Sequence, residues 1–156
     1  MDAIRFQQLA HRLYVKNIPF IPRLITWLLF HACHCDLSAR TIIGKRTTLG
    51  HKGMGIVINA ISKIGADCVI AQNVTLAGNK GKAPIVGNYC YIGCNSVILG
   101  GVKLSDNVTV GACSFVNCDI PENAVVVGSP AKIIKIKDEE EINAHKAMID
   151  KMHHRR

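Results

Sequence analysis

The most constraining feature of this sequence is a six-residue repeat. An aliphatic side chain recurs at every sixth position in two long series and a short one, and glycine often follows it directly. The aliphatic positions are Val86, Ile92, Ile98, Leu104, Val110 and Val116, then Ile58, Ile64, Ile70 and Leu76, and finally Ile43 and Leu49. A period of six fits no helical face, because an α-helix repeats every 3.6 residues. It fits short strands that turn at fixed intervals and stack their aliphatic side chains in a narrow interior.

The fifth position of each hexad is small or branched, which suits a tightly packed coil. It holds Ser62, Cys68, Val74, Cys90, Ser96, Val102, Val108 and Ser114. Hydrophobic residues make up 49% of the chain but aromatics only 5%, so the core must be built from small aliphatics. Three short strands would close one triangular coil, and successive coils would stack. At 156 residues we expect one such domain.

The repeat divides the chain into three parts. We expect a helical N-terminal flank over residues 1–35, a β-helix over 36–136, and a C-terminal helix with a basic tail over 137–156. The N-terminal flank reads as two helices broken at Pro19 and Pro22. The C-terminal helix opens with an acidic cluster from Asp138, and Ile142, Ile149 and Met152 could form its one apolar stripe.

The apolar run at residues 24–30 is too short to span a bilayer. We expect this helix to pack against the β-helix or a neighbouring subunit. The alternative is peripheral membrane attachment, helped by Arg12, Lys16 and Arg23.

The formal net charge of +8 suits a polyanionic partner such as nucleic acid, an acidic membrane or a phosphate-rich cofactor. The basic residues are scattered apart from the closing run His153 to Arg156, and no stretch alternates them with aromatics. We therefore expect no nucleic-acid partner.

The seven cysteines contain no CxxC pair, and no Cys and His spacing fits a zinc template. We expect no metal, no cleavable signal peptide, and a reduced cytoplasmic protein that uses its thiols as small apolar side chains.

The register of the repeat breaks twice. Three extra residues lie between Leu49 and Ile58, around His51, and four extra residues lie between Leu76 and Val86. A stacked coil cannot absorb these insertions, so both should bulge outward as loops on a rigid scaffold, where chemistry is usually found.

With these features the chain resembles the hexapeptide-repeat acyltransferases, and within them the catalytic half of serine acetyltransferase and the related sugar O-acetyltransferases. The resemblance covers roughly residues 36–136. It implies a mainly β fold, a left-handed parallel β-helix with short helical flanks, and an enzyme that moves an acetyl group from acetyl-CoA to a hydroxyl. Because the family's cofactor groove lies between adjacent subunits, and a β-helix of this size has flat sides, we expect a homotrimer.

Histidine suits the general base of such a transfer, because its ordinary pKa leaves it mostly neutral at cellular pH. Of the seven histidines only His51 falls within the repeat, in the first register break. The stretch from Leu49 to Ile58 resembles the one that carries the family's catalytic histidine. The resemblance also implies an aspartate fifteen residues earlier, and Asp36 stands there, where it would orient His51.

The resemblance also assigns acetyl-CoA contacts. The stretches around Cys94 and Ala112 resemble those whose backbone amides hold the pantetheine, and Gly78 matches a glycine of the cofactor groove. Lys132, in Gly128-Ser129-Pro130-Ala131-Lys132, matches the basic residue near the nucleotide phosphates. A covalent acetyl-cysteine on Cys94 is a weaker alternative, because no neighbouring base activates the thiol.

Two departures concern the acceptor. Gly50 and Lys82-Ala83 stand where serine acetyltransferases carry an aspartate and an Arg-His pair. We therefore expect a sugar or polysaccharide precursor as acceptor, small or lipid-linked and at the inner face of the membrane, held by Asn59, Asn79 and Lys82. The alternatives are a divergent serine O-acetyltransferase and a non-enzymatic β-helix scaffold.

Overall fold

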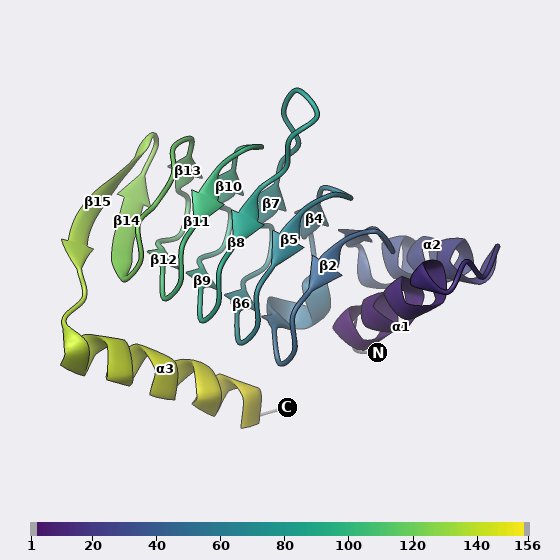
Figure 1. Ribbon diagram of the computed structural model, residues 1–156, viewed down its shortest axis with the longest axis horizontal. Coiled ribbons are helices and arrows are strands. Elements are labelled where there is room, and N and C mark those ends of the chain that lie inside the picture. Colours follow the sequence, from purple (N-terminus) through teal and green to yellow (C-terminus); the bar gives the residue numbers. More distant parts are fainter. Residues whose placement is uncertain (1–2, 155–156) are drawn as a thin grey trace.

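The computed structural model describes residues 3–154 and confirms the parallel β-helix of the hexad pattern. Each hexad forms a two-residue strand followed by a turn, and three strands close a coil (Figure 1). About four coils stack into three sheets. Sheet A contains β1 (Asp36–Leu37), β4 (Val57–Ile58), β7 (Thr75–Leu76), β10 (Val97–Ile98) and β13 (Phe115–Val116). Sheet B contains β2 (Ile42–Ile43), β5 (Lys63–Ile64), β8 (Ile85–Val86) and β11 (Lys103–Leu104). Sheet C contains β3 (Thr48–Leu49), β6 (Val69–Ile70), β9 (Tyr91–Ile92), β12 (Thr109–Val110), β14 (Ala124–Gly128) and β15 (Ala131–Ile136).

Three corners join the sheets. The AB corner comprises residues 38–41, 59–62, 77–84 and 99–102, and the BC corner comprises 44–47, 65–68, 87–90 and 105–108. The CA corner comprises residues 50–56, 71–74, 93–96 and 111–114. The two register breaks therefore lie on different corners, the first on the CA corner and the second on the AB corner.

The aliphatic residue of each hexad is the second residue of its strand and points into the interior. Ile70, Leu76, Ile92 and Leu104 are fully buried, and each such side chain contributes roughly 1.5–3 kcal/mol of burial free energy. The fifth-position side chains pack beside them and also bond to the next coil. The Cys68 thiol donates to the Gly87 carbonyl oxygen at 3.0 Å, so this thiol is a donor as well as a small apolar group.

The N-terminal flank forms α1 (Ala3–Val15) and α2 (Ile21–Cys33). The chain turns at Pro19, as expected, but Pro22 does not break a helix. It lies in the first turn of α2, where the missing N–H of proline costs no intrahelical hydrogen bond. No helix within residues 3–154 is long and apolar enough to cross a bilayer.

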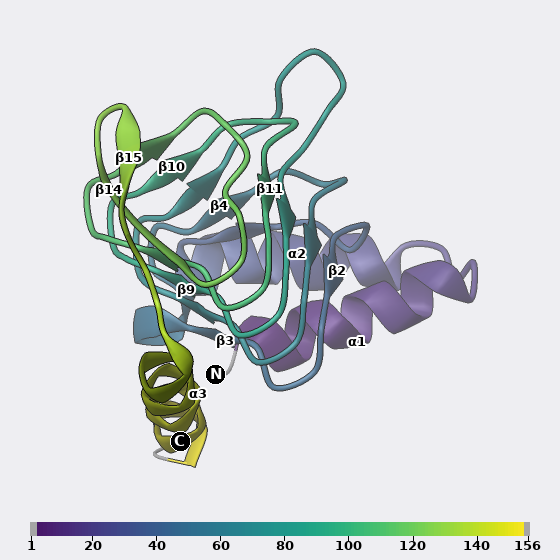
Figure 2. The ribbon, with the colours of Figure 1, turned by 60° about the vertical axis from the view of Figure 1, so that its left-hand side comes forward.

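The C-terminal helix α3 (Glu139–His154) lies along the BC corner, on a different side of the β-helix from α1 and α2 (Figure 2). Asp138 accepts a hydrogen bond from the Glu141 N–H, and the Glu141 carboxylate accepts one from the Asp138 N–H, a reciprocal cap. Of the expected apolar stripe, Ile149 is fully buried. The basic pair Arg155 and Arg156 lies outside the described residues.

Two buried side chains, His145 and Lys137, hold α3 to the coils. His145 Nε2 donates to the Tyr89 carbonyl oxygen at 2.8 Å, and Lys137 Nζ donates to the Asn107 carbonyl oxygen. Burial lowers the pKa of Lys137 from its ordinary 10.5 to about 8 and lowers the pKa of His145 as well.

Candidate functional site

The first register break forms a 3₁₀ turn (η1, Gly50–Gly53) that projects His51 from the CA corner. His51 and Lys52 both have left-handed backbone angles, with φ of 46° and 61°. Left-handed residues other than glycine recur at the corners of this fold, among them Asp67, Asn73 and Asn95, so these angles define the turn. The His51 side chain is exposed.

His51 occupies a repeated position of the CA corner. Strands β3, β6, β9, β12 and β14 pair in register, so the second residue after the aliphatic position stacks from coil to coil. We call these residues the CA row: His51, Gln72, Cys94, Ala112 and Gly128. Adjacent strands lie about 4.8 Å apart, so the row runs on the order of 20 Å from His51 to Gly128.

The middle of the CA row presents open backbone donors. Among the residues that the structure describes, the N–H groups of Gln72, Cys94 and Ala112 donate to no protein acceptor. Two of the equivalent BC-corner amides are capped by side chains: Ala66 N–H donates to Asn88 Oδ1 at 2.9 Å, and Asn88 N–H to Asp106 Oδ1 at 2.8 Å. At the AB corner, the described Ala60 and Gly78 amides are open as well. An extended ligand with carbonyl oxygens at coil spacing could accept the open donors.

Lys132 lies at the far end of the CA row from His51. It is exposed on β15, opposite Val127 of β14, just after the turn that begins at Gly128. Val127 also covers the last coil, because a side chain added at Gly111 would meet its Cγ1 at 2.7 Å. The predicted contacts Cys94, Ala112 and Lys132 therefore follow one line from His51.

A hollow of about 370 Å³ lies beside His51. The remaining lining residues come from the first coils and from the end of α3: Thr48, Gly50, Val69, Ala71, Gln72, Tyr91 and Met152. Sequence reasoning missed Gln72 and Met152. The hexad register alone would have placed Gln72 in one row with Cys94, whereas no sequence pattern shows that Met152 reaches this hollow.

Asp36 lies on β1, exposed at the end of sheet A. It lines a separate hollow of about 240 Å³ together with Ser38, Asn59, Thr75 and Gly78, among others. In the described part of the chain no hydrogen bond joins Asp36 to His51. The expected dyad is not formed within this single chain and stays a prediction.

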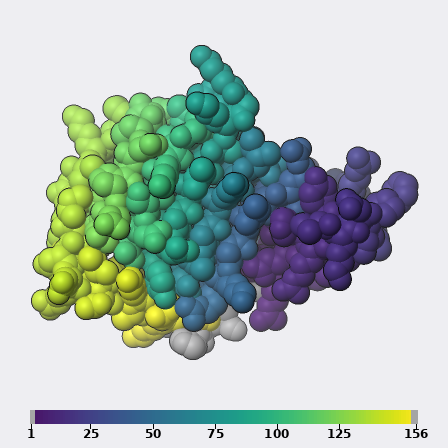
Figure 3. All heavy atoms as spheres, viewed as in Figure 1, coloured from purple at the N-terminus to yellow at the C-terminus, as the bar shows by residue number. Residues whose placement is uncertain are grey.

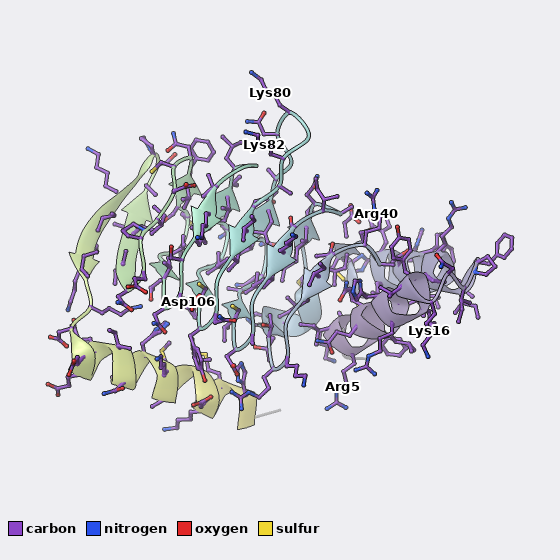
Figure 4. All side chains as sticks on the ribbon, in the orientation of Figure 1. Arg5, Lys16, Arg40, Lys80, Lys82 and Asp106 are labelled. Atoms are coloured by element: carbon purple, nitrogen blue, oxygen red, sulfur yellow. The ribbon has the colours of Figure 1, made fainter. Side chains whose placement is uncertain are left out.

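The second register break forms a hairpin at the AB corner, where Asn79 bridges Lys82 (Figure 4). Lys80 extends from the tip of the hairpin, whereas the stem of Lys82 lies beside Gly101 of the next coil. Gly78 precedes the hairpin, and a side chain there would come within 2.3 Å of Asn59 Nδ2. The predicted contacts Asn59, Gly78, Asn79 and Lys82 thus lie across sheet A from His51, and one chain does not bring the two groups together.

One acidic cluster lies under the end of α3. Oxygen and nitrogen atoms of Asp67, Asp150 and His153 lie within 4.8 Å of one another. The Arg46 guanidinium donates to Asp67 Oδ1 at 2.5 Å and neutralises that carboxylate. We interpret this group as a charge network that anchors α3.

Comparisons with known proteins agree with this fold. Residues 83–118 match the family described as "Bacterial transferase hexapeptide (six repeats)". The chain is 35% identical over 138 residues to serine acetyltransferase from Helicobacter pylori, covering 86% of this chain and 80% of that protein. It is 34% identical over 137 residues to the Synechococcus elongatus enzyme, covering 85% of this chain but only 56% of the relative. A solved serine acetyltransferase in complex with CoA superimposes with a TM-score of 0.79 at 30% identity, over 85% of this chain and 55% of that one.

Proposed function

This chain belongs to the serine acetyltransferase family, and from that premise we propose that it transfers an acetyl group from acetyl-CoA to the hydroxyl of L-serine. The observation that best supports this proposal is the CA row, a line of open backbone donors that begins at His51 and ends near Lys132. Side chains of the next coil cap the Ala66 and Asn88 amides of the BC corner, whereas the Gln72, Cys94 and Ala112 amides are left open to a ligand.

The residues of the CA row fit the proposed donor. The N–H groups of Gln72, Cys94 and Ala112 would hold the pantetheine amides, and the Lys132 ammonium would contact the phosphates. When bound, acetyl-CoA supplies the activated acetyl group. His51 would accept the proton of the attacking hydroxyl at its unprotonated ring nitrogen, and Asp36 would orient the ring.

L-serine replaces the sugar acceptor expected from the sequence, because the relatives are serine acetyltransferases. The hollow beside Asp36 adds support: Asp36 is its one charged lining residue and could pair with the serine ammonium. A glycosyl hydroxyl stays a second candidate, because neither hollow has a Lys or Arg in its lining for the serine carboxylate. A buried carboxylate without a partner costs several kcal/mol.

We propose that the enzyme acts as a homotrimer. The candidate residues are divided between the two edges of sheet A, so a second copy is needed to bring the AB hairpin of one chain to the His51 corner of another. Sedimentation equilibrium tests this step, and a monomer with full activity would contradict it.

The experiment is a free-thiol assay of CoA release with L-serine and a panel of sugars, alongside calorimetric CoA binding. We expect CoA to bind and L-serine to give the fastest turnover. Turnover only with a sugar would show that the acceptor is a sugar and not L-serine, and it would leave the proposed acetyl transfer unchanged. No CoA binding at all would refute the proposal.

A further inference from the structure

The helical flank leaves a large apolar surface uncovered. Pro22, Ile25 and Leu29 of α2 are buried, as expected for packing against the rest of the chain. Most of the other large side chains here are not: Leu24 and Trp27 of α2 are each 56% exposed, and Phe20, just before the helix, is 78% exposed. We define the flank face as the exposed residues Phe6, Leu9, Tyr14, Val15, Phe20, Ile21, Leu24, Trp27, Leu28 and Phe30.

This surface is unusual for a chain with an otherwise well-buried core. Single exposed apolar side chains are ordinary, but ten of them on two packed helices and the turn between them indicate an interaction site. The aromatic rings are clustered: Trp27 and Phe30 lie 4.3 and 5.3 Å from the His31 ring, measured between ring centroids. The helices protrude from one end of the molecule, where the coils do not cover them (Figure 3).

The positive charge of the two helices indicates which class of partner covers the flank face. Residues 3–35 contain no aspartate or glutamate, and their cations include Arg12, Lys16 and Arg23. A symmetric contact between two copies of this face would bring these cations together with no acidic residue of the helices to pair them. Anionic lipid headgroups would instead neutralise them, while Trp and Phe side chains favour the boundary between headgroups and acyl chains.

A cationic hollow lies beside α1. It has a volume of about 280 Å³ and is lined by Gln7, Gln8, His11, Arg12, Ile43, Lys45 and Arg46, with no acidic residue. Arg46 is already paired with Asp67, which leaves Arg12 and Lys45 as the cations available for a phosphate.

We propose that α1 and α2 dock on an anionic bilayer surface, with the flank face in the headgroup boundary and with Arg12, Lys16 and Arg23 on lipid phosphates. The docked helices would hold the candidate site near the lipid, because α1 packs on the His51 turn. A side chain added at Gly53 of that turn would meet Ala3 Cβ at 3.5 Å. Neither acetyl transfer nor its acceptor is needed for this inference.

The chain carries its own reporter, because Trp27 is the single tryptophan. The full chain is titrated with vesicles of phosphatidylglycerol or of phosphatidylcholine while Trp27 emission is recorded. We expect a shift to shorter wavelength with phosphatidylglycerol only, reversed in about 1 M salt, where the Debye length falls to about 3 Å. Equal behaviour with both lipids, or no shift, would overturn the proposal.

Substitutions inside and outside the flank face show where vesicle binding occurs. Leu24→Ser with Leu28→Ser should abolish vesicle binding, whereas Ile134→Ser, an equally exposed apolar site on β15, should not. Arg23→Gln keeps the apolar face and should weaken binding about fivefold, the loss expected for one cation near an anionic surface. If Trp27 emission is already shifted without vesicles, and sedimentation shows self-association that Leu24→Ser removes, the face binds a second copy and the membrane proposal fails.

Discussion

Replacing Lys137 with methionine tests the energetics of the contact that holds α3 in place. The Lys137 side chain is only 9% exposed, and burial lowers its pKa from 10.5 to about 8. The unfolded chain therefore binds more protons between pH 8 and pH 10.5, and the stability of the folded chain should rise through that window. Below pH 8 the penalty for burying the ammonium is complete and constant.

The full difference between these pKa values corresponds to about 3 kcal/mol. Water near the helix edge screens the ammonium, so about 1–2 kcal/mol should be measurable. Lys137→Met removes the titrating group, although it also leaves the Asn107 carbonyl oxygen without this donor. The free energy of unfolding of the wild type, relative to the variant, should rise by that amount between pH 7 and pH 10.

Urea unfolding followed by circular dichroism, at one protein concentration and four pH values, measures this difference. Lys63→Met, at an exposed strand position, is the matched control for the loss of a lysine charge. The other titrating groups are common to wild type and variant and cancel in the comparison. A difference that is flat from pH 7 to pH 10 would refute the reasoning, and one that falls would reverse its sign.

Three further predictions concern the site and the coils. His51→Ala should lower kcat by roughly 10²–10⁴-fold with an unchanged unfolding midpoint, and Asp36→Asn should act in the same direction but less, as the thiol assay would measure. Gly65→Ala should destabilise the fold by more than about 1 kcal/mol in urea unfolding, because its Cβ would lie 2.5 Å from the Gly87 carbonyl oxygen. Cys94→Ala should keep turnover within a few-fold, since the proposal uses only the backbone N–H there; complete loss with CoA binding intact would favour an acetyl-cysteine intermediate.

The β-helix could be predicted from the sequence because the same six-residue pattern recurs many times. Each of Ile64, Ile70 and Leu76 would be ambiguous alone, but the constant interval fixes strand, turn and inward direction together. The same argument predicts that both register breaks project outward as loops, since a close-packed coil has no room for extra residues.

The relative positions of the site residues could not be predicted in the same way. Spacing placed Asp36 and His51 fifteen residues apart, but it could not show that they line separate hollows. Contacts such as Met152 near His51 depend on how α3 returns along the coils, which no local pattern encodes. Likewise, the apolar run of α2 predicted packing against the β-helix or a neighbouring subunit. One face of α2 is buried within this chain, and packing against a subunit stays a prediction.

The two register breaks explain how acceptor choice could change while the scaffold stays constant. The residues of the hexads cannot vary freely, because a side chain added at a position such as Gly65 would collide with the neighbouring coil. The His51 turn and the Asn79 hairpin project from the stack at the two edges of sheet A, so their side chains can vary without changing the core. The open amides of the CA row belong to the backbone and persist through such changes. We therefore propose that donor binding is a property of the coils and that acceptor specificity is a property of the breaks, where Gly50 and Ala83 stand.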